Sequence, residues 1–166
     1  MFVKFLRENV YASIILLVVR VYLGWEWLSA GWGKVTKEFD ATFFLQDAVT
    51  KAEGERPTVQ SWWASFLEGF AIPNVELFNF LVAWGEVLVG IALIAGIFTT
   101  FAGLMGIIMN FAYLFSGTTS TNPQMVLLTI FILVAGANAG RFGLDYYVLP
   151  FLRRQFRRKG KNSETM

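Results

Sequence analysis

The sequence predicts an all-α integral membrane protein built as a bundle of four transmembrane helices. Hydrophobic residues make up 55% of the 166 residues, and the mean hydropathy is +0.52. Only 16% of the residues are charged, against roughly a quarter in a typical soluble domain. The apolar residues also gather in four segments that approach the length of about 20 residues that a helix needs to cross a bilayer.

The four predicted spans fall in a single domain that covers residues 1–166. They are residues 11–32, 75–98, 101–115 and 123–139. The third and fourth are shorter than a typical crossing. We expect no cleavable signal peptide, because Arg20 lies inside the first apolar segment and further spans follow it.

The distribution of lysine and arginine predicts the orientation. Lys4 and Arg7 precede the first span, and the tail at 141–166 holds seven cations, whereas seven acids outnumber the cations of the loop that begins at Lys34. By the positive-inside rule both termini are cytoplasmic and the long loop is extracytoplasmic. The sequence therefore predicts a multi-pass protein of a prokaryotic-type cell (plasma) membrane.

The long loop and the tail carry further patterns. ATFFLQDAVTKA and VQSWWASFLEGF have the pattern of short amphipathic helices, which either lie on the outer leaflet or pack against the bundle. The tail YYVLPFLRRQFRRKGK alternates aromatic and basic residues. It is predicted to anchor on anionic membrane lipid, with a partner-protein surface as the alternative. Nucleic acid is not expected as a partner.

The chain contains neither cysteine nor histidine. This composition excludes disulfides, iron–sulfur clusters, Cys/His zinc sites and histidine-ligated haem. We predict no metal site. It also removes the side chain that most often serves as a general base near neutral pH.

Charged residues inside the predicted spans are candidates for function. Arg20 shares one face of the first span with Gly24, Trp27, Gly31 and Lys34. Glu86 is the one acid in the apolar part of the second span. The two spans are antiparallel and the predicted depths of the two charges differ by only about 4–5 Å, so the sequence predicts an Arg20–Glu86 ion pair. An unpaired charge at the bilayer centre costs at least a few kcal/mol.

Asn110 of the third span is expected at the same depth as that pair. Arg20, Glu86 and Asn110 are therefore the predicted catalytic residues, with a purely structural role, fixing the helix register, as the alternative. Asn122 begins the fourth span, and its loop could hold an anion. At the inner end, Arg141 and Asp145 are expected to form a structural ion pair. Glu26 is placed near the outer boundary.

Four stretches together resemble the DoxX/DoxD-like membrane proteins. They are RVYLGWEWLSAGWGK, WGEVLVGIALIAGIFTTFAG, STNP and AGANAGRFGLD. The resemblance covers most of the chain, from about Arg20 to Pro150, and implies a compact four-helix membrane bundle. DoxD-type members are described as the membrane subunit of thiosulfate:quinone oxidoreductase. The family pattern falls on Arg20, Gly24, Gly31, Lys34, Glu86, Gly90, Asn110, Asn122, Gly140 and Asp145.

These observations support a membrane oxidoreductase, or a subunit of one, that passes electrons from a small thiosulfate-like anion to membrane quinone. Quinone would bind non-covalently as a co-substrate. The predicted substrate- and quinone-binding residues are Trp27, Trp32, Lys34, Asn122, Arg141 and Asp145. The absence of cysteine means that no persulfide can form, so the donor must react directly or with the help of a second subunit.

Two other functions stay open at this stage. In one, the protein is a non-enzymatic scaffold or a lipid- or small-molecule-binding partner, and the polar residues only lock the bundle. In the other, it is a small-anion transporter in which Arg20 binds the anion. With four spans, a transporter would need to form a homo-oligomer.

Overall fold

The computed structural model describes residues 1–152 and 154, and this part of the chain is helical with connecting turns. The elements are α1 (Phe2–Glu8), α2 (Val10–Thr36), α3 (Thr42–Thr50), α4 (Ser61–Phe66), the π-helical turn η1 (Leu67–Ala71), α5 (Val75–Ala95), α6 (Thr99–Phe115), α7 (Asn122–Ala135) and the 3-10 turn η2 (Gly136–Gly140). Residues 145–152 form a further short helical segment. The predicted lipid anchor covers residues 146–161, and half of it, residues 153 and 155–161, lies outside the described residues.

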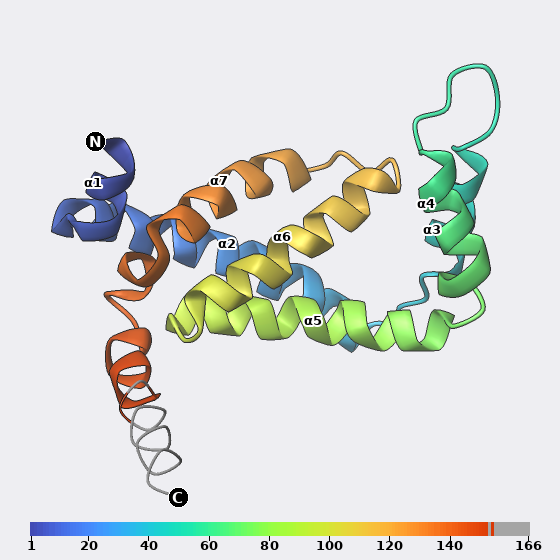
Figure 1. Cartoon of the computed structure of the whole chain (residues 1–166). Helices are drawn as coiled ribbons and strands as arrows, with labels where there is room; N and C mark the ends of the chain where they lie inside the picture. The colour runs from blue at the N-terminus through green and yellow to red at the C-terminus, as the bar shows by residue number, and fades with distance from the viewer. Residues whose placement is uncertain (153, 155–166) are drawn as a thin grey trace, which may run out of the picture.

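The long helices form one bundle (Figure 1). Helix α2 packs along α5, α5 packs against α6, and α6 packs against α7. Helix α1 contacts η2 at one end of the bundle, and α3 and α4 lie at the opposite end (Figure 1). The molecule therefore has two distinct ends joined by an apolar bundle.

Each predicted span lies within or closely overlaps a helix. Three helical stretches are long and apolar enough to cross a membrane, namely Val10–Thr36, Val75–Ala95 and Asn122–Gly140. Helix α6 is equally apolar in character but has 17 residues. The all-helical bundle is thus confirmed, whereas a fourth crossing and the cytoplasmic position of both termini stay predictions.

Glycines set the register between α2 and α5. A Cβ atom on Gly24 would lie 2.9 Å from the Gly90 carbonyl oxygen, and one on Gly31 would lie 2.6 Å from the Val87 nitrogen. A Cβ atom on Gly90 would lie 2.5 Å from the Leu28 nitrogen. Small residues let two helix backbones approach this closely, as is common in membrane helix pairs. The glycine face predicted on the first span therefore packs against α5.

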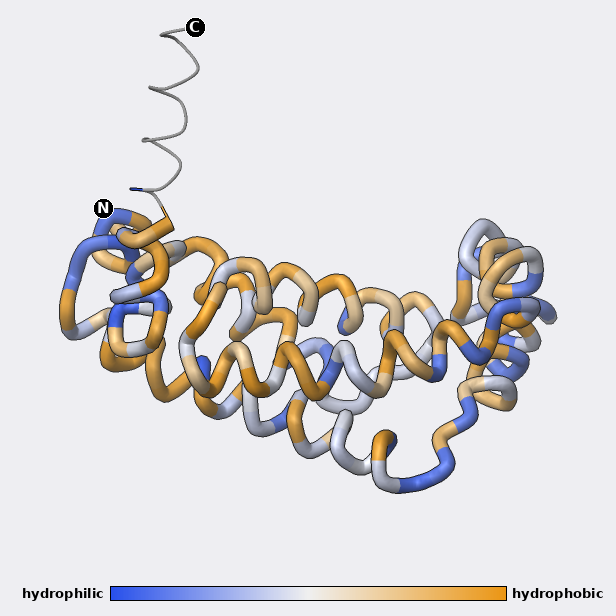
Figure 2. Tube along the Cα trace, turned by 90° about the horizontal axis from the view of Figure 1, so that it is seen from below, coloured by the Kyte–Doolittle hydropathy of each residue, from blue (hydrophilic) through white to orange (hydrophobic). Residues whose placement is uncertain are grey.

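Apolar side chains cover the outside of the bundle as well as its interior. The core contains Leu23, Leu93 and Ile132, each with no exposed surface. Large apolar residues such as Val18, Leu88 and Ile108 are more than half exposed. Hydrophilic segments gather toward the two ends of the bundle (Figure 2). An apolar belt between two polar ends is the surface that a membrane protein presents to lipid.

The amphipathic helices predicted in the long loop are present as α3 and α4–η1. Leu45 and Leu67 lie in a small core between them. The Trp63 indole N–H donates to the Ser116 hydroxyl over 2.9 Å, and the Trp62 ring contacts Phe115 with ring centroids 5.5 Å apart. Of the two placements considered from the sequence, the structure has the loop packed against the bundle, over the end of α6.

Candidate functional site

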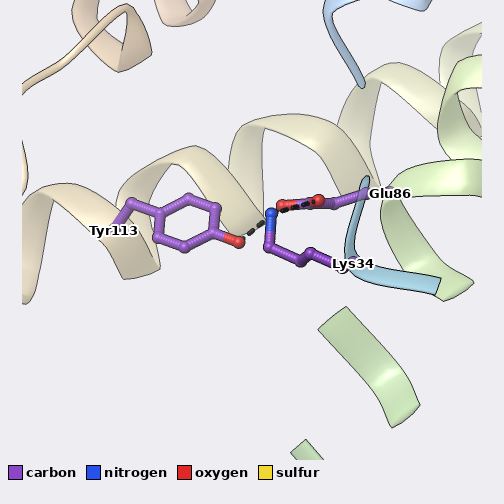
Figure 3. Close-up of polar contacts among 3 residues, drawn as sticks. All are labelled: Lys34, Glu86 and Tyr113. Carbon is purple, nitrogen blue, oxygen red and sulfur yellow. Dashed lines mark hydrogen bonds and ion pairs between the residues drawn. The ribbon is translucent and has the colours of Figure 1, made fainter. Parts of the chain in front are cut away.

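Glu86 lies at the centre of a buried polar cluster, and its side chain is 1% exposed. The Lys34 ammonium lies 2.6 Å from Glu86 Oε2, and the Tyr113 hydroxyl donates to Glu86 Oε1 over 2.5 Å (Figure 3). Both carboxylate oxygens therefore accept a hydrogen bond from a side chain that carries a transferable proton. These bonds satisfy the ionised form of Glu86 away from bulk water.

Three helices bring this cluster together. Lys34 lies in the last turn of α2, one turn after Gly31, whose close contact with the Glu86 side chain brings α2 against α5. Tyr113 is in α6, three residues after the buried Asn110. Residues three apart on a helix share a face, so Asn110 and Tyr113 are turned toward the same side of α6.

The predicted Arg20–Glu86 ion pair is wrong. Arg20 is 1% exposed, and its Nη2 atom donates to the Phe142 carbonyl oxygen over 2.9 Å. Its guanidinium lies against Gly96 and Gly143, at the C-terminal end of α5 and ten residues beyond Glu86. Arg20 therefore belongs to a different part of the molecule.

The error lies in the helix register. The prediction took the start of the first span to be level with the end of the second. In the structure the first turns of α2 extend past the end of α5 and contact α1 and η2 instead. The observed contacts of Gly24 and Gly31 place Glu86 beside the last turns of α2. The observed register differs from the predicted one by about eight residues, which at 1.5 Å per residue is a shift of about 12 Å.

The predicted Arg141–Asp145 ion pair is also wrong. The Asp145 carboxylate accepts hydrogen bonds from the backbone N–H groups of Phe98 (2.7 Å) and Thr99 (2.9 Å) at the start of α6. These N–H groups have no partner within their own helix. Asp145 is therefore bound to α6, and its sequence spacing from Arg141 does not determine its partner.

Asn110 and Trp27 are two further buried residues with polar atoms. Asn110 has no exposed surface, and within the described residues neither atom of its amide has a hydrogen-bond partner. The Trp27 indole N–H is likewise unpartnered there, and it lies against Gly106, one turn before Asn110. An unsatisfied buried polar group costs about 1–3 kcal/mol. Trp27 also lines a pocket beside Glu86, where its N–H group is placed to meet a ligand, whereas Asn110 is not part of that lining.

Two pockets meet at the Glu86 cluster. The first has a volume of about 220 Å³, and its lining includes Phe39, Phe44, Trp63, Phe66, Phe78 and Met109. The second has a volume of about 200 Å³, and its lining includes Glu26, Trp27, Glu86, Thr118, Thr121 and Asn122. Lys34 and Tyr113 line both pockets. The cluster thus separates an apolar, aromatic pocket from a polar one.

The structure divides the predicted site residues into two groups. Trp27, Lys34, Glu86 and Asn122 line the polar pocket together, although the sequence prediction assigned Lys34 and Asn122 to the donor and Glu86 and Trp27 to the quinone. Arg20, Arg141 and Asp145 lie at the other end of the bundle. Trp32, predicted as a wall of the site, is 59% exposed and is not part of the lining of either pocket.

The sequence analysis missed Tyr113 and placed Glu26 only at the outer boundary. The signal for Tyr113 was available: it follows Asn110 by three residues, on the polar face of the third span. Its pairing with Glu86 needed the register of α5 against α6, which spacing within one helix does not supply.

Residues 15–119 match the DoxX family. Among curated proteins and among solved structures, nothing matches the chain significantly. The matched range covers more than half of the chain and contains the whole Lys34–Glu86–Tyr113 cluster. The apolar helices and this match together identify the chain as a membrane protein that belongs to the DoxX family.

Proposed function

We propose that the protein is a membrane oxidoreductase, or the membrane subunit of one, that passes electrons from a small anionic donor such as thiosulfate to membrane quinone. One observation carries this proposal. The buried Lys34–Glu86–Tyr113 cluster lies between an apolar aromatic pocket and a polar pocket, with two of its proton-bearing groups lining both.

The apolar pocket suits the ring of a lipid quinone. Its aromatic lining offers faces for stacking, and the Phe44 and Tyr113 rings already pack edge to face with centroids 5.9 Å apart. The Lys34 ammonium and the Tyr113 hydroxyl are the polar groups available to donate to a quinone carbonyl oxygen. In pockets for such ligands, the lining is mostly apolar and a small number of polar groups fix the orientation of the ligand.

Reduction of a quinone to a quinol takes up two electrons and two protons. Lys34 and Tyr113 would deliver protons to the two oxygens, and Glu86, hydrogen-bonded to both, would pass replacement protons from the polar pocket. Oxidation of two thiosulfate ions supplies the two electrons and forms the sulfur–sulfur bond of tetrathionate. The charge and atom balance closes without any further oxidant or reductant.

The polar pocket is the proposed donor site. Lys34 supplies its positive charge, and the hydroxyl groups of Thr118 and Thr121 and the amide of Asn122 can hydrogen-bond to sulfur oxyanions. The Glu26 and Glu86 carboxylates oppose a dianion, so the net attraction is weak. We therefore expect a high KM for the donor.

The test is quinone reduction by the purified full-length protein in liposomes that contain a quinone. Thiosulfate is added outside, and quinol formation is followed by absorbance. We expect Glu86→Gln and Tyr113→Phe to lower kcat by at least about a hundredfold, as for removal of a proton-transfer group. Tyr22→Phe is the matched control, because the Tyr22 hydroxyl bonds to Gln124 instead of this cluster.

Two results would contradict the proposal. Turnover that survives both substitutions would show that the chemistry takes place elsewhere. If the wild type shows no turnover with thiosulfate or related donors, alone or with membrane partners that co-purify with it, the protein is not an oxidoreductase of this kind. Quinone binding without turnover would instead favour a small-molecule-binding partner protein.

A further inference from the structure

A separate pocket lies at the end of the bundle opposite Glu86. It has a volume of about 510 Å³ and is lined by residues from α1, from η2 and from the segment that follows it, including Arg7, Asn138, Arg141 and Tyr146. Arg7 and Arg141 are more than 130 positions apart in the sequence. The fold therefore brings two arginines from opposite ends of the chain to one pocket.

Specific hydrogen bonds hold this pocket together. The Asn138 amide nitrogen donates to the carbonyl oxygens of Leu6 (2.7 Å) and Asn9 (3.0 Å), which ties the junction of α1 and α2 to η2. The Arg7 Nε atom donates to the Val134 carbonyl oxygen over 2.9 Å. This bond fixes the Arg7 guanidinium through one nitrogen and leaves its two terminal nitrogens for another acceptor.

The ionised side chains that line the pocket, Arg7, Arg141 and Asp145, carry a net positive charge. Within the described residues, no carboxylate lies within 4.0 Å of either arginine. Asp145 also lines the pocket, but both of its oxygens accept backbone N–H groups of α6. Two guanidinium groups with free donors suit a phosphate, which guanidinium binds through paired hydrogen bonds.

The surface around the pocket is apolar. Phe2 and Phe5 of α1 are 61% and 42% exposed, and Tyr146, Tyr147 and Phe151 on the other side are at least 60% exposed. The Phe2 ring also packs against Phe131 on the flank of α7. Aromatic side chains that flank basic groups mark the boundary between lipid tails and headgroups. The anion at this position is thus one that carries acyl chains.

We propose that Arg7 and Arg141 bind the phosphate headgroup of an anionic phospholipid, with its acyl chains along the apolar flank of α1 and α7. This site is independent of the oxidoreductase proposal. It is also distinct from the cluster of cations at 153–161, because Arg7 and Arg141 both precede that stretch. Bound lipid would link the N-terminal helix to the segment after η2.

The test is native mass spectrometry of the full-length protein in a neutral detergent, titrated with phosphatidylglycerol. Phosphatidylcholine of the same chain length tests the need for net negative charge, and inorganic phosphate tests the need for acyl chains. The matched variants are Arg7→Gln/Arg141→Gln and Arg157→Gln/Arg158→Gln. Both remove two positive charges, but the second pair lies in the cluster of cations at 153–161 of the sequence.

We expect one tight phosphatidylglycerol site whose affinity falls about 25-fold in the Arg7/Arg141 variant, or about fivefold per arginine. The tail variant should keep that site, and inorganic phosphate should not displace the lipid. Equal losses in the two variants would show only a general charge effect and overturn the site. The proposal would also be overturned if phosphatidylcholine bound as tightly as phosphatidylglycerol, or if inorganic phosphate at equal concentration displaced phosphatidylglycerol.

A folding defect can be told apart from loss of the site. Arg7→Lys/Arg141→Lys keeps both charges, and its unfolding temperature without lipid controls for structure. We expect this variant to recover part of the lipid affinity. If the lysine variant unfolds at the same temperature as the wild type, the pocket does not need arginine for its structure. If the glutamine variant then binds lipid as tightly as the wild type, the proposal is wrong.

Discussion

The two ends of the bundle each bury a charge, but the two charges have different kinds of partner. Glu86 is bonded to two side chains, Lys34 and Tyr113, which also line pockets. Arg20 donates through Nη2 to a backbone carbonyl and lies against two glycines in packed turns, while its Nε and Nη1 atoms have no hydrogen-bond partner among the described residues. Side-chain partners at a pocket can exchange with a ligand, whereas backbone partners in a packed turn cannot. We infer that the Glu86 end is adapted for chemistry and the Arg20 end for fixing the fold.

Gly96→Ala should produce the largest effect on stability. Gly96 has φ +66°, and a Cβ atom there would clash with the Arg20 guanidinium and lie 2.9 Å from the Cα atom of Gly143. Positive φ and overpacking together should lower the free energy of unfolding by about 3–4 kcal/mol.

The control is Gly33→Ala, at a helical glycine where an added Cβ atom would meet nothing within 4 Å beyond its own helix backbone. It should be neutral or slightly stabilising, because alanine favours helix. Unfolding in mixed detergent micelles measures both variants. Equal stability of the two would show that the Arg20 end is not a tight structural contact.

Lys34→Met tests how far the Lys34–Glu86 ion pair stabilises the Glu86 end of the bundle. The substitution leaves Glu86 buried without its cation, which should lower the free energy of unfolding by about 2–3 kcal/mol. The loss is smaller than for breaking a fully buried ion pair, because the Lys34 side chain is 22% exposed. Adding Glu86→Gln should recover most of that loss, since an amide needs no counter-charge. The double variant should still lack quinone reduction.

The wild type, the two single variants and the double variant form a double-mutant cycle, which separates the contribution of the Lys34–Glu86 pair to stability from its contribution to activity. Unfolding measurements on the four proteins give the coupling energy directly. A double variant as unstable as Lys34→Met would mean that the lysine stabilises the fold by packing alone. A double variant that is both stable and active would remove the pair from the proposed mechanism.

The sequence predicted the kind of structure well and the pairing of its charges poorly. The helical bundle, the loop helices and the α2 glycine face all follow from periodicity within one segment. The partners of Arg20 and Glu86 depend on how far α2 extends past α5, and on turns such as Gly96 and Gly143 that only the folded chain brings together. Asp145 illustrates the same limit, since its partners are backbone atoms 46 and 47 residues away.

Glu26→Gln should have a smaller effect, and it should improve the binding of the donor instead of weakening it. Glu26 lines the polar pocket together with Glu86 and Lys34. Removing its charge should strengthen the binding of a dianionic donor and lower its KM about two- to fivefold, with kcat unchanged. Steady-state kinetics at two salt concentrations check this, since screening should shrink the difference. A KM that does not move would place the donor outside this pocket.

The smallest expected effect comes from Asp40, an exposed charge that contrasts with both ends. The side chain and backbone of Thr42 donate to its carboxylate, and these bonds lower the pKa of Asp40 below its usual value near 3.8. A lowered pKa in the folded state stabilises α3 at neutral pH, and this contribution is lost as the pH falls through the folded pKa. Asp40→Ala should therefore unfold slightly earlier than the wild type at pH 7, while the two should unfold alike once Asp40 is protonated. A difference that persists in acid would mean that Asp40 acts through hydrogen bonds that do not need its charge.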